Sequence, residues 1–389
     1  MKNIFYIWLT LILSEQLLAV DADKFCSRFI ARLIGAPATG ALLSECKSLA
    51  AKDPASAIRR ITQEAGFYED TVRYLFQADS SKDDIHLTPF NDMTATSVGL
   101  VKNDQDYRRF FFDDVVYTCN KPNLPPYALN NNDHYTQCAI GPYADNLVES
   151  RQSELSPIFA ARPDVPAGVF TTRGFAEAYY FKGTNRAAVR FALKNFLCED
   201  IDTFHDTKVP DNKVRQDVDR QPGGDPKAWV NECKGCHAGM DPFAGAFAYL
   251  DWDEDATSLV YNKPPEGSTP DVLRAAISEK YLRNASTFPG GFVTVDDFWE
   301  NRWNEGGNTR VNWPKNASGN GPKSFGEMFK DIGQMGRCMA KKVYKRTCLE
   351  DLDLASNKIT DLAKKFESSG YKVRELFIES GAMCPGKDL

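Results

Sequence analysis

Ten cysteines constrain the fold of this 389-residue chain more than any other feature of its sequence. Two of them lie in one short run, Cys233-Lys234-Gly235-Cys236-His237. The other eight are dispersed along the chain as Cys26, Cys46, Cys119, Cys138, Cys198, Cys338, Cys348 and Cys384. An even number of dispersed cysteines indicates disulfide bonds, which persist in oxidising compartments.

Proximity along the chain predicts how these eight cysteines pair. The expected bonds join Cys26 to Cys46, Cys119 to Cys138 and Cys338 to Cys348, and leave Cys198 and Cys384 to close a long loop.

The first 22 residues predict the compartment. A positive Lys2 precedes an apolar run at 4–13, and small residues follow at Ala19 and Ala22. This order is typical of a cleaved secretory signal peptide, here residues 1–22. An uncleaved anchor is the weaker alternative, because the run is shorter than the ~20 residues that a membrane span needs. No other stretch is long and apolar enough, so we expect no transmembrane span in the mature chain.

Composition and periodicity predict a mainly α protein with a large core. Hydrophobic residues make up 42% of the chain, and apolar residues recur at helical spacing. The net charge of -6 argues against a nucleic-acid-binding surface, which needs a clustered positive field. A helix is expected to start at Pro54 after its cap Asp53, and 117–135 is expected to be a disulfide-pinned loop. The other expected helices span 90–102, 143–158, 171–181, 185–197, 325–344 and 356–380.

The run at 233–237 has the spacing C-x-x-C-H, which is typical of covalent haem attachment. Two thiols with two intervening residues reach the two vinyl groups on one edge of a porphyrin, and the next imidazole falls under the iron. Cys233 and Cys236 are therefore the predicted attachment residues for one covalent haem c, and His237 is the predicted proximal ligand. Asp225 and Pro226 predict a short helix that delivers Cys233 at its end.

Three other interpretations of the run are weaker. It can be a redox dithiol, but no thioredoxin-like βαβ pattern surrounds it. It can be half of a zinc site, but neither a second C-x-x-C nor an H-x-x-x-H pair supplies further ligands. The run can also occur by chance. This is less easily reconciled with the predicted export signal, because haem attachment of this kind takes place outside the cytoplasm.

Longer stretches around the run resemble one family. They are CKGCHAGMDPFAGAFAYLD at 233–251, AGVFTTRGFAEAYYFKGTNRAAVRFALKNFLC at 167–198, and MGRCMAKKVYKRTC at 335–348 followed by ITDLAKKFESSGYKVRELFIESG at 359–381. These stretches are similar to the haem-motif domain and the small helical tail domain of planctomycete-type cytochrome c-like proteins. The resemblance covers 167–389, and it departs from the family pattern where the glycine after Asp241-Pro242 is displaced to Gly245.

The resemblance implies a multi-helical cytochrome c-like haem domain with additional helical regions and long loops. After the signal peptide (1–22), the expected parts are an N-terminal helical region (23–165), the haem-binding domain (166–262) and a C-terminal helical domain (263–389). The family also implies a bacterial protein, secreted across the inner membrane to the periplasm or the cell surface.

The residue on the other side of the iron decides much of the function, because Met or His closes the site and an open position admits small ligands. His134 is the first candidate for this distal ligand, since loops often present ligands, and Met339 is the next. Met240 lies three residues after His237 and would project on the proximal side. Against these candidates, an isolated loop histidine is usually exposed, and Met339 belongs to a helical row of methionines typical of a core.

Together these features predict a secreted mono-haem c-type cytochrome that binds haem and transfers single electrons to or from a redox partner protein. One alternative is a haem-dependent oxidoreductase, peroxidase- or oxygenase-like, with an open distal position. Another is a scaffold or sensor protein that contains haem. The sequence names neither the redox partner nor the oligomeric state.

Overall fold

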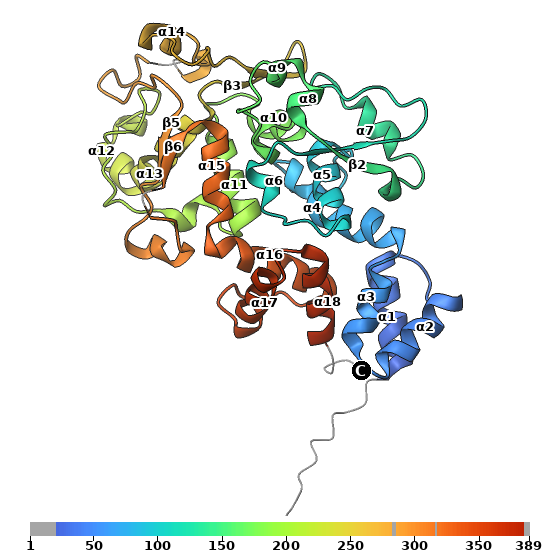
Figure 1. Ribbon diagram of the computed structural model, residues 1–389. Helices are drawn as coiled ribbons and strands as arrows, with labels where there is room; N and C mark the ends of the chain where they lie inside the picture. The colour runs from blue at the N-terminus through green and yellow to red at the C-terminus, as the bar shows by residue number, and fades with distance from the viewer. Residues whose placement is uncertain (1–20, 282–284, 316, 385–389) are drawn as a thin grey trace, which may run out of the picture.

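A computed structural model describes residues 21–281, 285–315 and 317–384, and it confirms a mainly α protein. The strands form three separate two-stranded antiparallel sheets (Figure 1). Among the described residues, none of the helices has both the length and the apolar composition needed to cross a membrane. Residues 1–20 of the predicted signal peptide lie outside the described residues.

The first three and the last three described helices form one helical layer, at the bottom of Figure 1. Its members are α1 (Ala22–Ile34), α2 (Gly40–Ala50), α3 (Pro54–Ile61), α16 (Gly333–Cys348), α17 (Asn357–Ser368) and α18 (Val373–Met383). Helix α3 packs on α18, and α1 contacts α16. The predicted start of α3 is confirmed, because the Asp53 carboxylate accepts hydrogen bonds from the backbone N–H groups of Ala55 and Ser56.

The rest of the chain forms a larger body above this layer (Figure 1). Its helices are α4 (Arg73–Gln77), α5 (Asp92–Lys102), α6 (Arg109–Phe112), α7 (Asp133–Cys138), α8 (Gln152–Leu155), α9 (Pro157–Ala160), α10 (Arg173–Tyr179), α11 (Arg186–Leu197), α12 (Pro226–Ala228), α13 (Lys234–Ala244), α14 (Pro270–Ala275) and α15 (Gly321–Lys330). Its strands are β1 (Val116–Cys119), β2 (Leu147–Ser150), β3 (Leu250–Asp253), β4 (Ser258–Tyr261), β5 (Phe298–Glu300) and β6 (Ser318–Asn320).

One hydrophobic core runs through both parts of the molecule. It extends from Phe25 in α1 to Ile378 in α18 and includes residues of all three regions expected after the signal peptide. The boundaries at 165/166 and 262/263 therefore fall within a chain that shares one core, and they stay a prediction.

Several predicted helices are confirmed with small shifts at their ends. Helices α5, α10 and α11 take the places expected at 90–102, 171–181 and 185–197. Each expected C-terminal helix is instead split in two, into α15 and α16 and into α17 and α18. The second split falls at Gly370 and Tyr371, whose φ angles of 74° and 58° are left-handed and end a helix.

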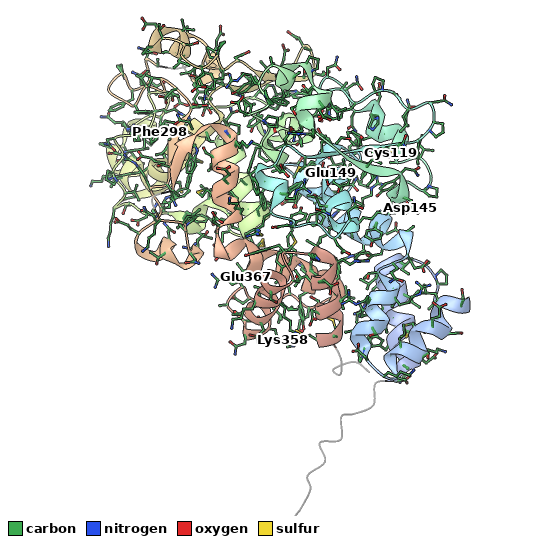
Figure 2. All side chains as sticks on the ribbon, viewed as in Figure 1. Cys119, Asp145, Glu149, Phe298, Lys358 and Glu367 are labelled. Atoms are coloured by element: carbon green, nitrogen blue, oxygen red, sulfur yellow. A yellow bond between two sulfur atoms is a disulfide. The ribbon has the colours of Figure 1, made fainter. Side chains whose placement is uncertain are left out.

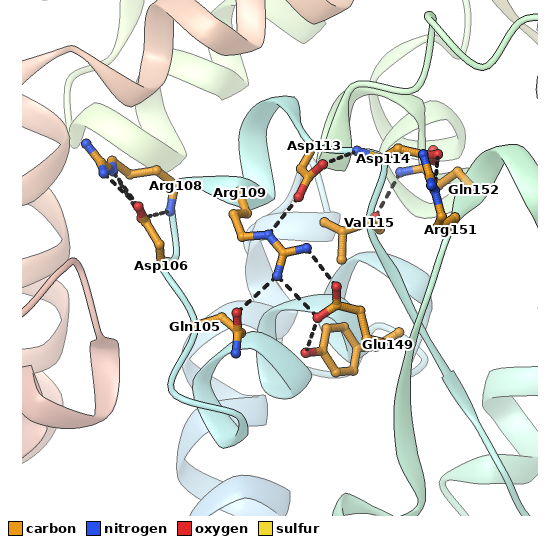
Figure 3. Close-up of polar contacts among 11 residues, drawn as sticks. Gln105, Asp106, Arg108, Arg109, Asp113, Asp114, Val115, Glu149, Arg151 and Gln152 are labelled. Carbon is orange, nitrogen blue, oxygen red and sulfur yellow. Dashed lines mark hydrogen bonds and ion pairs between the residues drawn. The ribbon is translucent and has the colours of Figure 1, made fainter.

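The predicted helix over 143–158 is wrong, because part of this segment is strand β2, paired antiparallel with β1. Glu149 on β2 accepts a hydrogen bond from Nη2 of Arg109 at 2.7 Å (Figure 3) and from the Tyr117 hydroxyl at 3.1 Å. These partners lie far away along the chain. Periodicity within the segment itself could not reveal them, since strand preference depends on tertiary neighbours.

The four disulfides of the structure confirm two of the predicted pairs and overturn the other two. The confirmed bonds are Cys26–Cys46, which joins α1 to α2, and Cys119–Cys138, which joins β1 to α7. The remaining cysteines pair as Cys198–Cys338 and Cys348–Cys384.

The predicted bond between Cys338 and Cys348 is wrong because both residues lie on α16. Ten positions of helix separate their Cα atoms by about 15 Å, at ~1.5 Å per residue. Bonded cysteines need Cα atoms about 4.4–6.8 Å apart. Cys338 instead reaches Cys198 just after α11, with Cα atoms 5.3 Å apart.

Peptide mapping without reduction tests this pairing. We expect one linked peptide pair containing Cys198 and Cys338, and a Cys338–Cys348 linkage would contradict the structure.

Replacing Cys198 and Cys338 by Ala should lower the free energy of unfolding by about 2–5 kcal/mol, because the bond spans 140 positions of chain. The Cys26→Ala/Cys46→Ala variant is the matched control, and its shorter span of 20 positions predicts a smaller loss.

Candidate functional site

The C-x-x-C-H run lies within one continuous helical passage. Asp225 caps its first turn by accepting a hydrogen bond from the Lys227 backbone N–H at 2.8 Å, and Pro226 takes the first helical position. After α12, Trp229–Cys233 form a π-helical turn, and α13 follows directly. The predicted delivery of Cys233 by a short helix is confirmed.

Cys233, Cys236 and His237 lie on one face of this passage, because positions three and four apart are neighbours on a helix surface. Each of the three is half-buried. Neither thiol belongs to a disulfide, whereas the other eight cysteines are all paired. Two free thiols and one imidazole thus share a partly accessible face of α13.

The imidazole of His237 is oriented by a buried carboxylate. Its Nδ1 lies 3.2 Å from Oδ1 of Asp241, one turn further along α13. The Asp241 side chain is 0% exposed and that of His237 is 24% exposed. An ionised carboxylate can only accept, so Nδ1 donates, and in the neutral imidazole the lone pair then lies on Nε2. This is the tautomer of a metal-bound histidine, and Nε2 has no hydrogen-bond partner in the described part of the chain.

Two arginines hold Asp241 as an anion. Arg186 on α11 donates from Nε to Oδ1 at 2.7 Å and from Nη2 to Oδ2 at 2.9 Å, and the Arg215 backbone N–H donates to Oδ2 at 3.0 Å. Burial by itself would raise the pKa of Asp241, but the charges of Arg186 and Arg215 outweigh it and hold that pKa well below its usual value. Arg186 also donates to both carboxylate oxygens of Asp217, at 2.7 and 2.8 Å. We call these four residues the Asp241 network.

An aromatic side chain and a cation lie beside the same helical passage. The Trp229 ring is 5% exposed, and its centroid lies 6.2 Å from that of the His237 ring. The Arg220 guanidinium lies over Trp229 at 4.3 Å and over Phe288 at 4.5 Å. Arg220 also donates from Nη1 to the Val218 carbonyl at 3.0 Å and from Nη2 to the Val214 carbonyl at 3.1 Å, so its guanidinium is held in this position.

The opposite face of α13 packs into the protein. A Cβ on Gly235 would lie 2.6 Å from the ring of His205, and a Cβ on Gly239 would lie 2.1 Å from the ring of Trp303. Gly235 is two positions after Cys233, so it points about 200° away around the helix axis. His205 therefore packs against Gly235, and the turn that precedes it also reaches the thiol face, where Cys236 Sγ donates to the Ile201 carbonyl at 3.8 Å.

The predicted distal ligand His134 makes a hydrogen bond through each ring nitrogen. Its Nε2 accepts from the backbone N–H of Cys119 at 2.9 Å, and its Nδ1 donates to the Pro125 carbonyl at 2.7 Å. Both ring nitrogens are thus used, and they pin the loop after β1. His134 is buried in α7, far from α13 in Figure 1, and Figure 2 labels Cys119 and Phe298 on these two sides of the molecule.

Met339, the second candidate, is a core residue, as its helical spacing allowed. It is buried in α16 together with Met335, and Met328 is buried in α15. His86 stacks on Tyr74 with ring centroids 3.8 Å apart. The remaining histidine, His205, packs against Gly235, one position before Cys236.

Two other interpretations of the run are a zinc site and a redox dithiol. In the described ranges, no group of three or more His, Cys, Asp and Glu side chains is placed to hold a metal ion. Burial and the nearby charge of Asp202 raise the pKa of the Cys236 thiol, whereas redox dithiols depend on a lowered thiol pKa.

The Asp241 network was not among the features predicted from the sequence. The spacing of His237 and Asp241, four positions apart on one helix, was a usable signal. Arg186 lies 55 positions before Asp241, and Arg215 contributes its backbone N–H. Local patterns do not show such partners.

No protein-family model, curated protein or solved structure matches the chain. Function is therefore inferred from the site itself.

The two glycines on the packed face of α13 predict different effects of substitution. Gly239→Ala should lower the free energy of unfolding by about 1–3 kcal/mol, because its methyl group meets the fully buried Trp303 ring. Gly235→Ala is the matched control. Its neighbour His205 is exposed and can move, and alanine gains about 1 kcal/mol of helix propensity over glycine. Urea unfolding measures both variants, and equal losses would contradict this packing.

Proposed function

We propose that the protein is a mono-haem c-type cytochrome that holds one covalent haem c and transfers single electrons. The observation that carries the proposal is the set of Cys233, Cys236 and His237 on one face of α13, with both thiols free and Nε2 without a partner among the described residues. The cytochrome c-like haem domain implied by the family resemblance is part of this proposal.

Cys233 and Cys236 would hold the cofactor, and His237 would bind the iron through Nε2. In attachment, each thiol adds across one vinyl double bond. A C–S bond forms, the thiol hydrogen goes to the other vinyl carbon, and no oxidant is consumed. Bound in this way, haem supplies a one-electron couple between ferric and ferrous iron.

The other residues of the site serve to orient the ligand and to limit solvent access. Asp241 fixes the ring of His237 and its tautomer. Trp229 and Arg220 shield the neighbouring surface. Because Cys233 and Cys236 are only half-buried, this face of α13 stays accessible to a redox partner protein.

Export to the periplasm or the cell surface belongs to the same proposal. The four disulfides fit an oxidising compartment. Haem attachment to two thiols also takes place in that compartment, and we place the redox partner there.

A pyridine haemochrome spectrum tests haem attachment directly. Protein exported from a host with c-type maturation should keep its haem through acid–acetone extraction and show the c-type α-band. Cys233→Ser/Cys236→Ser should lose the covalent haem. Because pyridine replaces the axial ligands, the iron ligand is tested by the absorption spectrum of the holoprotein without pyridine, which His237→Ala should change. His205→Ala is the matched control, because His205 packs against Gly235 but has no part in the proposed attachment or ligation, and both spectra should stay unchanged. Wild-type protein without haem would overturn the proposal.

A second candidate is a haem-dependent oxidoreductase with an open distal position. The observation that favours it is that both ring nitrogens of His134 are in use and that Met339 is buried in α16, so neither predicted distal ligand is free. Such an enzyme would use the same attachment residues and add a small-molecule substrate.

Cyanide binding separates the two candidates. An open distal position predicts a high-spin ferric spectrum that shifts to low spin when cyanide is added, because a vacant coordination position accepts a strong ligand. A low-spin ferric spectrum that does not respond to cyanide or peroxide would instead support a closed electron-transfer site. The Met339→Ala variant is the control, since a core residue should leave either spectrum unchanged.

A further inference from the structure

The Asp241 network places more charge in the interior than packing requires. Two carboxylates and two guanidinium groups lie together, and one of the carboxylates, that of Asp241, contacts His237. The Arg215 side chain is buried, and its Nε and Nη1 have no hydrogen-bond partner among the described residues. Buried ion pairs are often no better for stability than apolar residues of similar volume. Stability alone therefore does not account for the network.

The network has a specific consequence at His237. Arg186 bonds both carboxylate oxygens of Asp241, and the Arg215 backbone N–H adds a third bond. The carboxylate is fully buried, so it is held in place beside Nδ1 and has no access to solvent. The i, i+4 spacing on α13 keeps the two side chains together as the helix forms.

A fixed carboxylate at Nδ1 changes the imidazole as a ligand. A carboxylate that accepts the Nδ1 hydrogen raises the basicity of Nε2. A more basic Nε2 donates more electron density to iron. Ferric iron carries one more positive charge than ferrous iron, so it gains more from that donation.

We propose that Asp241 is a positioning residue that makes His237 a strong electron donor and thereby lowers the reduction potential of the site. This inference rests on the proposed haem attachment and deepens it. We expect the reduction potential to be lower than that of a site whose proximal imidazole donates to a neutral acceptor. A lowered potential would suit a redox partner that also has a low potential.

Redox titration of the holoprotein carrying Asp241→Asn tests the proposal. Asparagine keeps the shape and can still accept through its carbonyl oxygen, but it has no charge. At a fixed ambient potential we expect the ratio of reduced to oxidised haem to rise about tenfold, which corresponds to a midpoint about 59 mV higher for one electron. Asp241→Glu restores the carboxylate and should return most of this change.

Asp217→Asn is the matched control. It removes one negative charge from the same network, and Asp217 bonds Arg186 without contacting His237. Its effect on the ratio should be clearly smaller than that of Asp241→Asn. Equal changes in the two variants would overturn the proposal, because they would reflect net charge alone.

The unmodified holoprotein offers a second test that does not depend on the folding of a variant. With ¹⁵N-labelled histidine in the ferrous state, the Nδ1 hydrogen of His237 should give a downfield proton resonance that exchanges slowly, because the hydrogen is donated to a buried carboxylate. Exchange at the rate of a solvent-exposed imidazole would overturn the proposal.

The outcomes also separate this proposal from the one on which it rests. Wild-type protein without covalent haem overturns the proposed function, and this inference with it. Covalent haem whose potential is unchanged by Asp241→Asn overturns the inference alone.

Discussion

The ion pair between Arg186 and Asp241 is the contact on which the arrangement around the C-x-x-C-H run depends. It ties α11 to α13, and the Arg215 backbone N–H brings a third segment to the same carboxylate. Because a buried charge is strongly destabilising without its partner, loss of either side chain would loosen all three segments together. Asp241 can orient the ring of His237 only because Arg186 and the Arg215 backbone hold the Asp241 carboxylate in place. The orientation of His237, on the face of α13 that carries Cys233 and Cys236, therefore depends on an ion pair one helical turn further along α13.

Apolar packing complements this ion pair on the other side of α13. Phe243 lies 5.7 Å from Phe325 of α15, and Phe325 lies 5.3 Å from Phe170, measured between ring centroids. Gly239 admits Trp303 against the helix backbone. Helix α13 is therefore fixed between a charged side and an aromatic side, which leaves a third face free to carry the thiols and the imidazole. A cofactor held covalently on such a face would sit on a rigid support.

The structure assigns His134 a different task from the one that its loop position suggested. Both of its ring nitrogens are engaged, and the Cys119–Cys138 bond closes the same loop, so the histidine and the disulfide together stabilise a segment rich in Asn and Pro. This segment lies across the larger body from α13. A large part of the chain therefore serves to build a scaffold around a small site.

Local sequence patterns were sufficient to predict the C-x-x-C-H run, the helix cap at Asp225 and the helices α5, α10 and α11. They were also sufficient to predict the two disulfides between cysteines that are close in sequence. Helix periodicity, capping and the reach of a short loop act over a few residues, so the sequence by itself determined them. The strand partner of Glu149, the bond from Cys198 to Cys338 and the arginines around Asp241 depend on contacts between segments far apart in the chain. Only the tertiary structure decided these, because burial and charge pairing depend on which segments meet when the core closes.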